Sequence, residues 1–255
     1  MGVFPSDHVI GNNPRYRGIV KAAFQGAACG NLMVVGIQPR WPETGYGYIE
    51  FPRGAKPGGA APIPVRQFHE KPELPKAKRY CTAGNFYWNS GMFFWRTDVL
   101  LDRLRRHLPK TATVLASLPG FGARSFADKL KSAFPLCDNI SIDYAVLEKA
   151  AREKAGGVHG IAAGDFGWND VGSWNAVYEL LDRDSCGNVI ALESICLDSH
   201  NNFVDARGKV VALVGVKDLI VVDTPDALLV AARDRAQQVG DIVKALEKQN
   251  RHDLL

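Results

Sequence analysis

Two different spacings of apolar residues divide this chain. Up to about residue 184, unbroken apolar runs such as 32–37 (LMVVGI) alternate with stretches that have the spacing of amphipathic helices, such as 14–29 and 97–108. A short continuous apolar run is typical of a strand that is buried on both faces. The alternation of such strands with helices predicts an α/β fold with a largely parallel sheet.

The same criteria predict the other elements of this first region. We expect the end of a buried strand at 3–4 and further strands at 48–51, 65–71 and 158–163. We expect a polar helix or loop at 73–80, one or two helices within 111–134, and helices at 144–153 and 173–181. Thr97 or Asp98 is the expected cap of one helix, and Ser141 or Asp143 of another. The Pro, Gly and Ala content of 53–64 indicates a mobile connection.

After residue 184 the pattern changes to short β-like runs separated by Asn, Asp and Gly. These runs lie at 188–192, 202–204, 210–214, 219–222 and 228–231, and a helical stretch at 233–248 follows them. We therefore predict two domains, 1–184 and 185–255, the second being a small β-rich unit built as a β-solenoid or a sandwich-like cap. No clear internal repeat is visible in it. Its apolar runs indicate packing on the first domain, a homodimer interface, or both.

Composition and charge narrow the classes of partner. The 255 residues are 46% hydrophobic and 23% charged, which is typical of a globular protein with a substantial core. The net charge of +4 comes from scattered Lys and Arg, and their densest cluster, 103–107, falls on an amphipathic helix. We interpret that cluster as a solvated face and expect no nucleic-acid partner, whereas an anionic small substrate agrees with the charge balance.

The cysteines and the apolar runs predict the compartment. The chain has five cysteines, an odd number without a CxxC pair, and no signal peptide precedes them. This pattern predicts a reduced, cytoplasmic protein without a cysteine metal site. No apolar run reaches the length of a transmembrane span, so we expect no membrane partner.

One carboxylate stands out in the stretch 164–174 (GDFGWNDVGSW). Asp170 lies between two tryptophans and two glycines, just before the helix expected at 173–181. An Asp in a glycine-rich turn is most often a helix cap or a turn residue. The alternative is a metal or substrate ligand in a strand-to-helix loop, which requires partners from elsewhere in the chain.

Other polar residues follow expected strands. Asp7 would stand beyond the carboxyl end of the strand at 3–4, where open α/β sheets bind ligands. Glu70 and Lys71 end another strand, where a carboxylate accepts from hydroxyls and an ammonium meets a phosphate. Asn89, within the aromatic-dense run 85–95, is able to present its amide to a ligand. Each of these residues also has a competing interpretation. Asp7 and Asn89 are commonly turn residues, and Glu70 and Lys71 are an ordinary pair on a surface. Asp143 is the candidate helix cap noted above.

Taken together, these pieces resemble the bacterial mannose-1-phosphate guanylyltransferases (GDP-mannose pyrophosphorylases), which are sugar-phosphate nucleotidyltransferases. The matching pieces are PSDH at 5–8, PETGYGYIE at 42–50, FHEKP at 68–72, NSGMFFW at 89–95, SIDYAVLEKA at 141–150, WNDVGSW at 168–174, DSHNNFV at 198–204 and VGVKDLIVVDTPDALLV at 214–230. FxEKP and WxDxGxW mark the wider superfamily, and the last piece is more particular to the mannose branch.

The resemblance implies a Rossmann-like nucleotidyltransferase sheet, a β-helix-like second domain with a terminal helix, and a reaction. GTP and mannose 1-phosphate would give GDP-mannose and pyrophosphate, for polysaccharide biosynthesis. The sugar phosphate oxygen would attack the α-phosphorus in line, with Mg²⁺ as cofactor and without a covalent enzyme intermediate. This agrees with the absence of a nucleophile-and-base pattern in the sequence.

The resemblance also implies roles for particular residues. Asp7 and Asp170 would hold Mg²⁺, a hard ion that prefers oxygen ligands, and would count with Lys71 as catalytic residues. Among the substrate-binding residues, Gly47 would let the backbone approach the sugar closely, and Glu70 and Asn89 would bind sugar hydroxyls. Lys71 would bind the sugar phosphate, and Asp143 would also contact the substrate.

One departure from the family pattern leaves alternatives open. Family members begin with a strand and a glycine-rich loop of GxGxRLWPLS type that cradles the triphosphate, and the printed sequence begins after it, so the sheet is expected to be incomplete at its N-terminal side. One alternative is therefore a weak or inactive truncated paralogue that binds sugar phosphate or regulates an intact enzyme. Another is a related nucleotidyltransferase that uses a different sugar or nucleotide. No isomerase domain follows residue 255, so we expect no mannose 6-phosphate isomerase activity.

Overall fold

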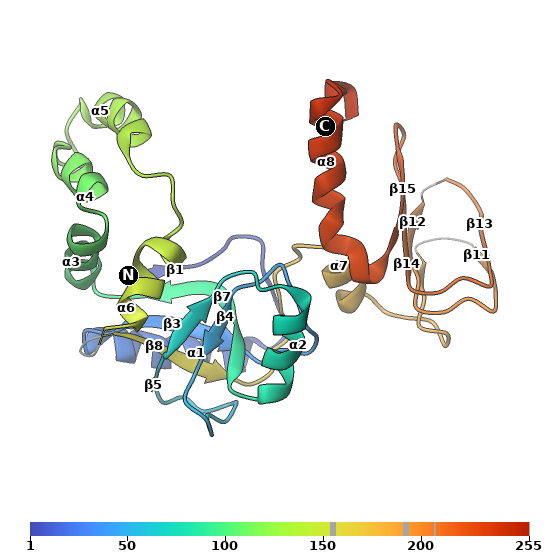
Figure 1. The fold of residues 1–255 in the computed structure, drawn as a ribbon, viewed down its shortest axis with the longest axis horizontal. Coiled ribbons are helices and arrows are strands. Elements are labelled where there is room, and N and C mark those ends of the chain that lie inside the picture. The colour runs from blue at the N-terminus through green and yellow to red at the C-terminus, as the bar shows by residue number, and fades with distance from the viewer. Residues whose placement is uncertain (154–156, 191–193, 207, 255) are drawn as a thin grey trace. The chain divides into compact units, whose positions relative to one another are not determined.

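The computed structural model describes residues 1–153, 157–190, 194–206 and 208–254. These residues form two compact units (Figure 1). The first unit contains Met1–Ser6 and Ile10–Trp168, and the second contains Asp7–Val9 and Asn169–Leu255. The chain passes between the units near β2 (Val9–Ile10) and β9 (Trp168–Asn169), which pair in a two-stranded sheet.

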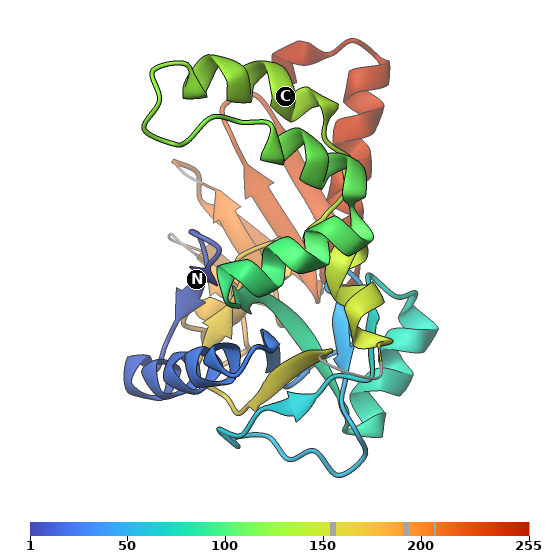
Figure 2. The same cartoon turned by 90° about the vertical axis from the view of Figure 1, so that its left-hand side faces the viewer.

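A mixed sheet forms the centre of the first unit, with the strand order β5-β8-β3-β7-β4-β6 and with β1 paired to β7. Its strands are β1 (Gly2–Val3), β3 (Leu32–Ile37), β4 (Tyr48–Glu50), β5 (Ile63–Pro64), β6 (Gln67–His69), β7 (Phe86–Phe94) and β8 (Val158–Ala163). Its helical elements are α1 (Asn13–Ala28), α2 (Leu74–Ala83), α3 (Thr97–His107), α4 (Pro109–Ala116), α5 (Phe126–Ala133), η1 (Phe134–Leu136), η2 (Asp143–Leu147) and α6 (Glu148–Ala151). Figure 2 shows α3, α4 and α5 as one group of consecutive helices.

The α/β class is confirmed, but the expected predominance of parallel pairing is wrong for the described strands. β3 pairs in parallel with β8 and antiparallel with β7, and the pairs β4–β7, β4–β6, β5–β8 and β1–β7 are antiparallel. The reason is that a continuous apolar run reports burial on both faces and carries no information about strand direction.

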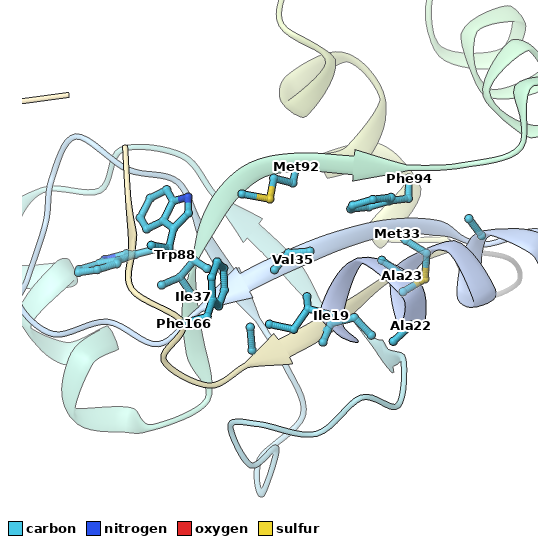
Figure 3. Close-up of a cluster of buried hydrophobic side chains, with 14 of the residues drawn as sticks. Ile19, Ala22, Ala23, Met33, Val35, Ile37, Trp88, Met92, Phe94 and Phe166 are labelled. Carbon is cyan, nitrogen blue, oxygen red and sulfur yellow. The ribbon is translucent and has the colours of Figure 1, made fainter. Parts of the chain in front are cut away.

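Both faces of β3 are covered by helices, as its unbroken apolar run predicts. Met33, Val35 and Ile37 pack in the cluster that includes the buried face of α1 (Figure 3). The alternate residues Leu32 and Val34 pack in a second cluster with side chains of α3, η2 and α6. This alternation follows from the two-residue period of a strand and makes the unit a helix–sheet–helix sandwich.

Three local expectations for this unit are corrected. The segment at 3–4 is not buried, since the side chains of Val3 and Phe4 are exposed. The segment 53–64 is not merely a connection, because it contributes β5 to the sheet and its Gly58 N–H donates to the Ala162 carbonyl at 2.9 Å. α3 has no side-chain cap hydrogen bond.

The second unit is a parallel β-helix with helical elements beside it. Its elements are α7 (Trp174–Leu180), β10 (Val189–Ile190), β11 (Ser194–Leu197), β12 (Phe203–Ala206), β13 (Val211–Val214), β14 (Leu219–Asp223), β15 (Leu228–Ala232), η3 (Arg233–Gln238), α8 (Val239–Lys248) and η4 (His252–Leu254). Strands β10, β12 and β14 stack in parallel, as do β11 and β13, and β15 adds antiparallel to β14. The solenoid interpretation is therefore confirmed. The strand β11 was missed, and the stretch expected to be one helix at 233–248 divides into η3 and α8.

An asparagine ladder connects the coils of this solenoid. The buried Asn202 side chain donates to the Asn188 side-chain oxygen at 3.0 Å and accepts from the Leu219 N–H at 3.0 Å. Val189 on β10 pairs with Phe203 on β12, which pairs with Ile220 on β14, so equivalent positions do recur along the chain. The repeat is invisible in sequence because it rests on a few positions and unequal intervals.

Candidate functional site

Four residues that lie far apart in the sequence meet in the first unit. Gly47 precedes β4, Glu70 follows β6, Asn89 lies in β7 and Asp143 begins η2. The Gly47 carbonyl accepts from the Asn89 N–H at 2.8 Å, and the Asn89 side chain donates to Asp143 Oδ1 at 2.8 Å. We call these four residues the carboxylate–amide cluster.

A side chain at Gly47 would displace the Glu70 carboxylate. A Cβ atom at this position would overlap the Glu70 carboxylate and would lie 3.6 Å from Asn89 Cβ. A glycine here therefore lets the backbone, the Glu70 carboxylate and the Asn89 amide lie close together.

The amide of Asn89 is held in one orientation. Its nitrogen donates to Asp143, and its oxygen accepts from the Gly91 N–H at 3.3 Å. The register between β3 and β7 shifts at this point, and Gly91 has φ +71°, a conformation that favours glycine. Asp143 makes no cap hydrogen bond at the start of η2, so the expectation that it serves as a helix cap is wrong. Its carboxylate is instead the acceptor that orients Asn89.

Burial and mutual repulsion determine the electrostatics of the cluster. Burial raises the pKa of Glu70, the Asp143 charge raises it further, and the neighbouring Lys71 opposes the increase. Burial also raises the pKa of Asp143, while the hydrogen bond from Asn89 opposes it. Two partly buried carboxylates near one another favour protonation or a polyhydroxylated ligand that donates to both.

Lys71 is exposed beside this cluster and has a constrained backbone. Its φ of +43° lies in the left-handed region, which costs a residue with a Cβ about 1 kcal/mol. The buried Pro72 follows it directly and limits the conformations available to the residue before it. An exposed ammonium on a constrained backbone next to two carboxylates is suited to a ligand that carries both hydroxyls and an anionic group.

The carboxylates of Asp7 and Asp170 belong to the second unit. Asp170 accepts from the Gly172 N–H at 3.2 Å and is followed by Val171 at φ +55°. The cap of α7 is Ser173, whose oxygen accepts from the Ala176 N–H at 3.2 Å. The interpretation of Asp170 as a helix cap is therefore wrong, although the residue does lie in a turn.

Asp7 and Asp170 both act electrostatically on His8. Burial lowers the pKa of His8, and the charges of Asp170 and Asp7 oppose that decrease. His8 has a place in the quoted PSDH piece, but sequence reasoning gave it no role. Two carboxylates suit Mg²⁺, which binds one or two of them together with oxygens of a substrate. Among the described residues no three His, Cys, Asp or Glu side chains gather as a metal site, and that ligand pattern does not require three.

Glu43 is a second residue that sequence reasoning missed. Its side chain is only 8% exposed, and it accepts hydrogen bonds within the segment that leads to Gly47. The signal was present in the sequence, because Glu43 lies within the quoted PETGYGYIE piece. Nothing in that pattern distinguished it from a solvent-exposed loop glutamate.

Comparison with known proteins matches both regions of the chain to family models. The model of the nucleotidyl transferase family matches residues 1–185, and that of the mannose-phosphate isomerase/GMP-like β-helix domain matches residues 192–246. No helix among the described residues is both long and apolar enough to span a bilayer.

Three similar proteins illustrate the match. The xanthan biosynthesis protein XanB of Xanthomonas campestris pv. campestris (strain B100) is 38% identical over 98% of this chain and 52% of its own length. The mannose-1-phosphate guanylyltransferase of Klebsiella pneumoniae is 36% identical over 99% of this chain and 53% of its own length. The crystal structure of mannose-1-phosphate geranyltransferase from Thermus thermophilus has a TM-score of 0.77 and 32% identity, and the match covers 96% of this chain and 69% of that one. The chain thus spans about half the length of the curated relatives that it matches.

Proposed function

Because this chain belongs to the nucleotidyl transferase family, we propose that it acts as a mannose-1-phosphate guanylyltransferase. It would convert GTP and mannose 1-phosphate to GDP-mannose and pyrophosphate, and its product would supply polysaccharide synthesis. The observation that carries the proposal is the carboxylate–amide cluster, because a hexose is a ligand with several neighbouring hydroxyl donors. The guanylyltransferase named among its relatives and the xanthan protein support the choice of substrate and pathway class.

We assign sugar recognition to the four residues of the cluster. The Glu70 and Asp143 oxygens accept from hydroxyls, and the second N–H of the Asn89 amide donates to a hydroxyl oxygen. Gly47 allows the sugar ring to approach the backbone. Burial strengthens each of these hydrogen bonds relative to bulk water and makes an unpaired partner costly, which is the basis of discrimination between sugars.

We assign the phosphate of the sugar to Lys71. Its exposed ammonium, next to Glu70, places a positive charge beside the hydroxyl-binding carboxylates. The Lys71 ammonium is a compact charge on a flexible side chain. It can therefore stay close to the sugar phosphate while the bond to the α-phosphorus forms. The sugar phosphate oxygen bonds to the α-phosphorus of GTP, and the bond from that phosphorus to the pyrophosphate oxygen breaks. The residues bind, orient and neutralise charge.

We assign the metal to Asp7 and Asp170. When bound, Mg²⁺ neutralises the charge that develops on the phosphate oxygens. Asp7 and Asp170 would hold the ion with their carboxylate oxygens, the type of ligand that Mg²⁺ prefers. Asp170 lies between β9 and α7, so a strand-to-helix loop carries it, which is the setting that a ligand role requires.

The test is a direct assay of products. The 255-residue chain is incubated with GTP, mannose 1-phosphate and Mg²⁺, and GDP-mannose and pyrophosphate are quantified together. The proposal expects equal amounts of both products and no product after chelation of the metal. Glucose 1-phosphate and UTP serve as matched alternative substrates. Pyrophosphate without GDP-mannose, or a preference for either alternative, would contradict the proposal.

A further inference from the structure

Glu43 is a buried carboxylate that binds the segment leading to Gly47. Its Oε1 atom accepts from the N–H groups of Thr44 and Gly45, both at 2.8 Å. Its Oε2 atom accepts from Trp41 Nε1 at 3.0 Å. Hydrogen bonds to an ionised acceptor are about twice as strong as neutral ones, so these three restrain residues on both sides of Glu43.

The backbone of the same segment is tied to the sheet beneath it. The hydroxyl of Tyr48, a fully buried residue on β4, donates to the Glu43 carbonyl at 2.8 Å. Burial raises the pKa of Tyr48, so this hydroxyl remains protonated and continues to donate. The Cys81 thiol donates to the Trp41 carbonyl at 3.2 Å. The segment 41–45 is therefore held by hydrogen bonds within itself and by hydrogen bonds from Tyr48 and Cys81.

The fixed segment leads directly into the carboxylate–amide cluster. Two residues separate Thr44 from Gly47, and one of them, Tyr46, packs edge-on against Trp88 and Trp168 at centroid distances of 5.2 and 5.7 Å. A methyl group at Gly47 would displace the Glu70 carboxylate from the position that it has in the structure. A displacement of the segment by a few tenths of an ångström would therefore reach the cluster.

We propose that Glu43 is a positioning residue for the sugar phosphate: its carboxylate fixes the segment 41–45 so that Gly47 stands at the right distance from Glu70 and Asn89. Glu43 does not touch the substrate. It sets the width of the sugar site, and this inference rests on the proposed function. Each carboxylate oxygen of Glu43 acts as an acceptor, since Oε1 accepts from two backbone N–H groups and Oε2 accepts from the Trp41 indole N–H.

These acceptor roles suggest a sharp pair of variants. Glu43→Gln keeps the shape but turns one acceptor into a donor, which must then face either the Trp41 N–H or the two backbone N–H groups. Trp41→Phe removes the indole donor. In the double variant the glutamine oxygen faces Thr44 and Gly45, and its NH₂ group faces a ring without a donor. The double variant therefore removes the conflict between the glutamine NH₂ group and the Trp41 indole N–H.

The experiment measures KM for mannose 1-phosphate, KM for GTP and kcat for the whole chain and the three variants, together with hydrogen exchange of the segment 41–47 and the unfolding temperature. We expect Glu43→Gln to raise KM for mannose 1-phosphate about tenfold, since a charged hydrogen bond is lost, with little change in KM for GTP. The amides of Thr44 and Gly45 should exchange faster. The double variant should recover most of both effects.

The outcomes separate this inference from the proposed function. If the unaltered chain does not use mannose 1-phosphate, the function fails and the inference fails with it. If the chain is active and Glu43→Gln leaves KM for mannose 1-phosphate unchanged, only the positioning role is wrong. Equal increases in both KM values, or a double variant as impaired as the single one, would show a general loss of structure and would also overturn the positioning role.

Discussion

The carboxylate–amide cluster and the carboxylates of Asp7 and Asp170 are arranged in different ways. The cluster is partly buried, and its members bond to one another: Asn89 to Asp143, and Gly47 to Asn89. Asp7 is exposed, and Asp170 accepts from a backbone N–H within its own turn. Hydrogen bonds between residues of different elements thus connect the cluster, whereas Asp170 is bonded to the loop that carries it.

The roles that we propose for the two groups would explain this difference. A neutral sugar offers only hydrogen bonds, whose net value depends on partners that are already oriented. A divalent cation supplies its own strong field and draws carboxylates into place, so its ligands tolerate mobile loops. We therefore expect substitutions in the cluster to act through geometry and substitutions at the aspartates to act through charge.

The largest expected effect is at Asp170. Asp170→Asn keeps the turn, because an amide oxygen still accepts from the Gly172 N–H, but removes the charge that we assign to the metal. We expect kcat/KM to fall at least about 100-fold, because this is the usual effect of removing one group that stabilises charge in the transition state. The unfolding temperature should not change. Steady-state assays over a range of Mg²⁺ concentration measure the loss.

A matched control for that variant lies in the loop between β8 and β9. Asp165 is exposed and accepts from the Gly167 N–H at 2.9 Å in a turn of the same kind. Asp165→Asn should leave kcat/KM and its dependence on Mg²⁺ unchanged. Equal losses in the two variants would mean that negative charge in this part of the chain, rather than Asp170 itself, determines the activity.

The next largest effect is geometric. Gly47→Ala places a methyl group where the Glu70 carboxylate lies, so the carboxylate has to move away from its position in the cluster. We expect affinity for mannose 1-phosphate to fall about 30-fold, because one hydrogen bond to a charged group contributes about 2 kcal/mol. Isothermal titration measures it. Gly18→Ala is the control, because a Cβ there meets nothing within 4 Å on the exposed side of α1. A normal affinity in the Gly47 variant would contradict the close approach of the sugar.

A smaller effect is expected at Lys71. Lys71→Ala should weaken mannose 1-phosphate about tenfold through loss of one charged contact, and mannose itself not at all. Lys76→Ala on the exposed side of α2 is the control. Lys71→Gly should bind mannose 1-phosphate as weakly as Lys71→Ala does. Its free energy of unfolding should be higher than that of Lys71→Ala by about 1 kcal/mol, because glycine adopts the positive φ without strain. Weakened binding of mannose as well would mean that Lys71 shapes the cluster.

Sequence reasoning recovered the parts of this molecule that local pattern determines. The apolar run of β3, the helix α1, the position of Glu70 after β6 and the short strands of the second unit could all be predicted from spacing. Strand direction, the β7 irregularity and the asparagine ladder could not, since each depends on which distant segments pair. The bond between Asn89 and Asp143 spans 54 residues, so the local signal at Asp143 indicated a helix cap. Glu43 was missed for the same reason, because only its burial and its hydrogen bonds with Trp41 and Tyr48 distinguish it.

The smallest effect is one of stability and depends on pH through Asp143. Folding raises the pKa values of Asp143 and Glu70, so the folded state binds protons more readily than the unfolded state over the range between the two sets of values. The stability that these groups contribute is therefore complete below their unfolded pKa values and is lost as pH rises through the folded ones. Asp143→Asn removes one charge while its side-chain oxygen still accepts from Asn89. We expect the denaturant midpoint of the variant to be higher than that of the unaltered chain near neutral pH, and this difference to disappear on acidification.

Because the same substitution removes a hydroxyl acceptor, the more stable variant should bind mannose 1-phosphate more weakly. An equal gain at acid and neutral pH would mean that the gain comes from packing, and that the two carboxylates do not repel each other in the folded chain.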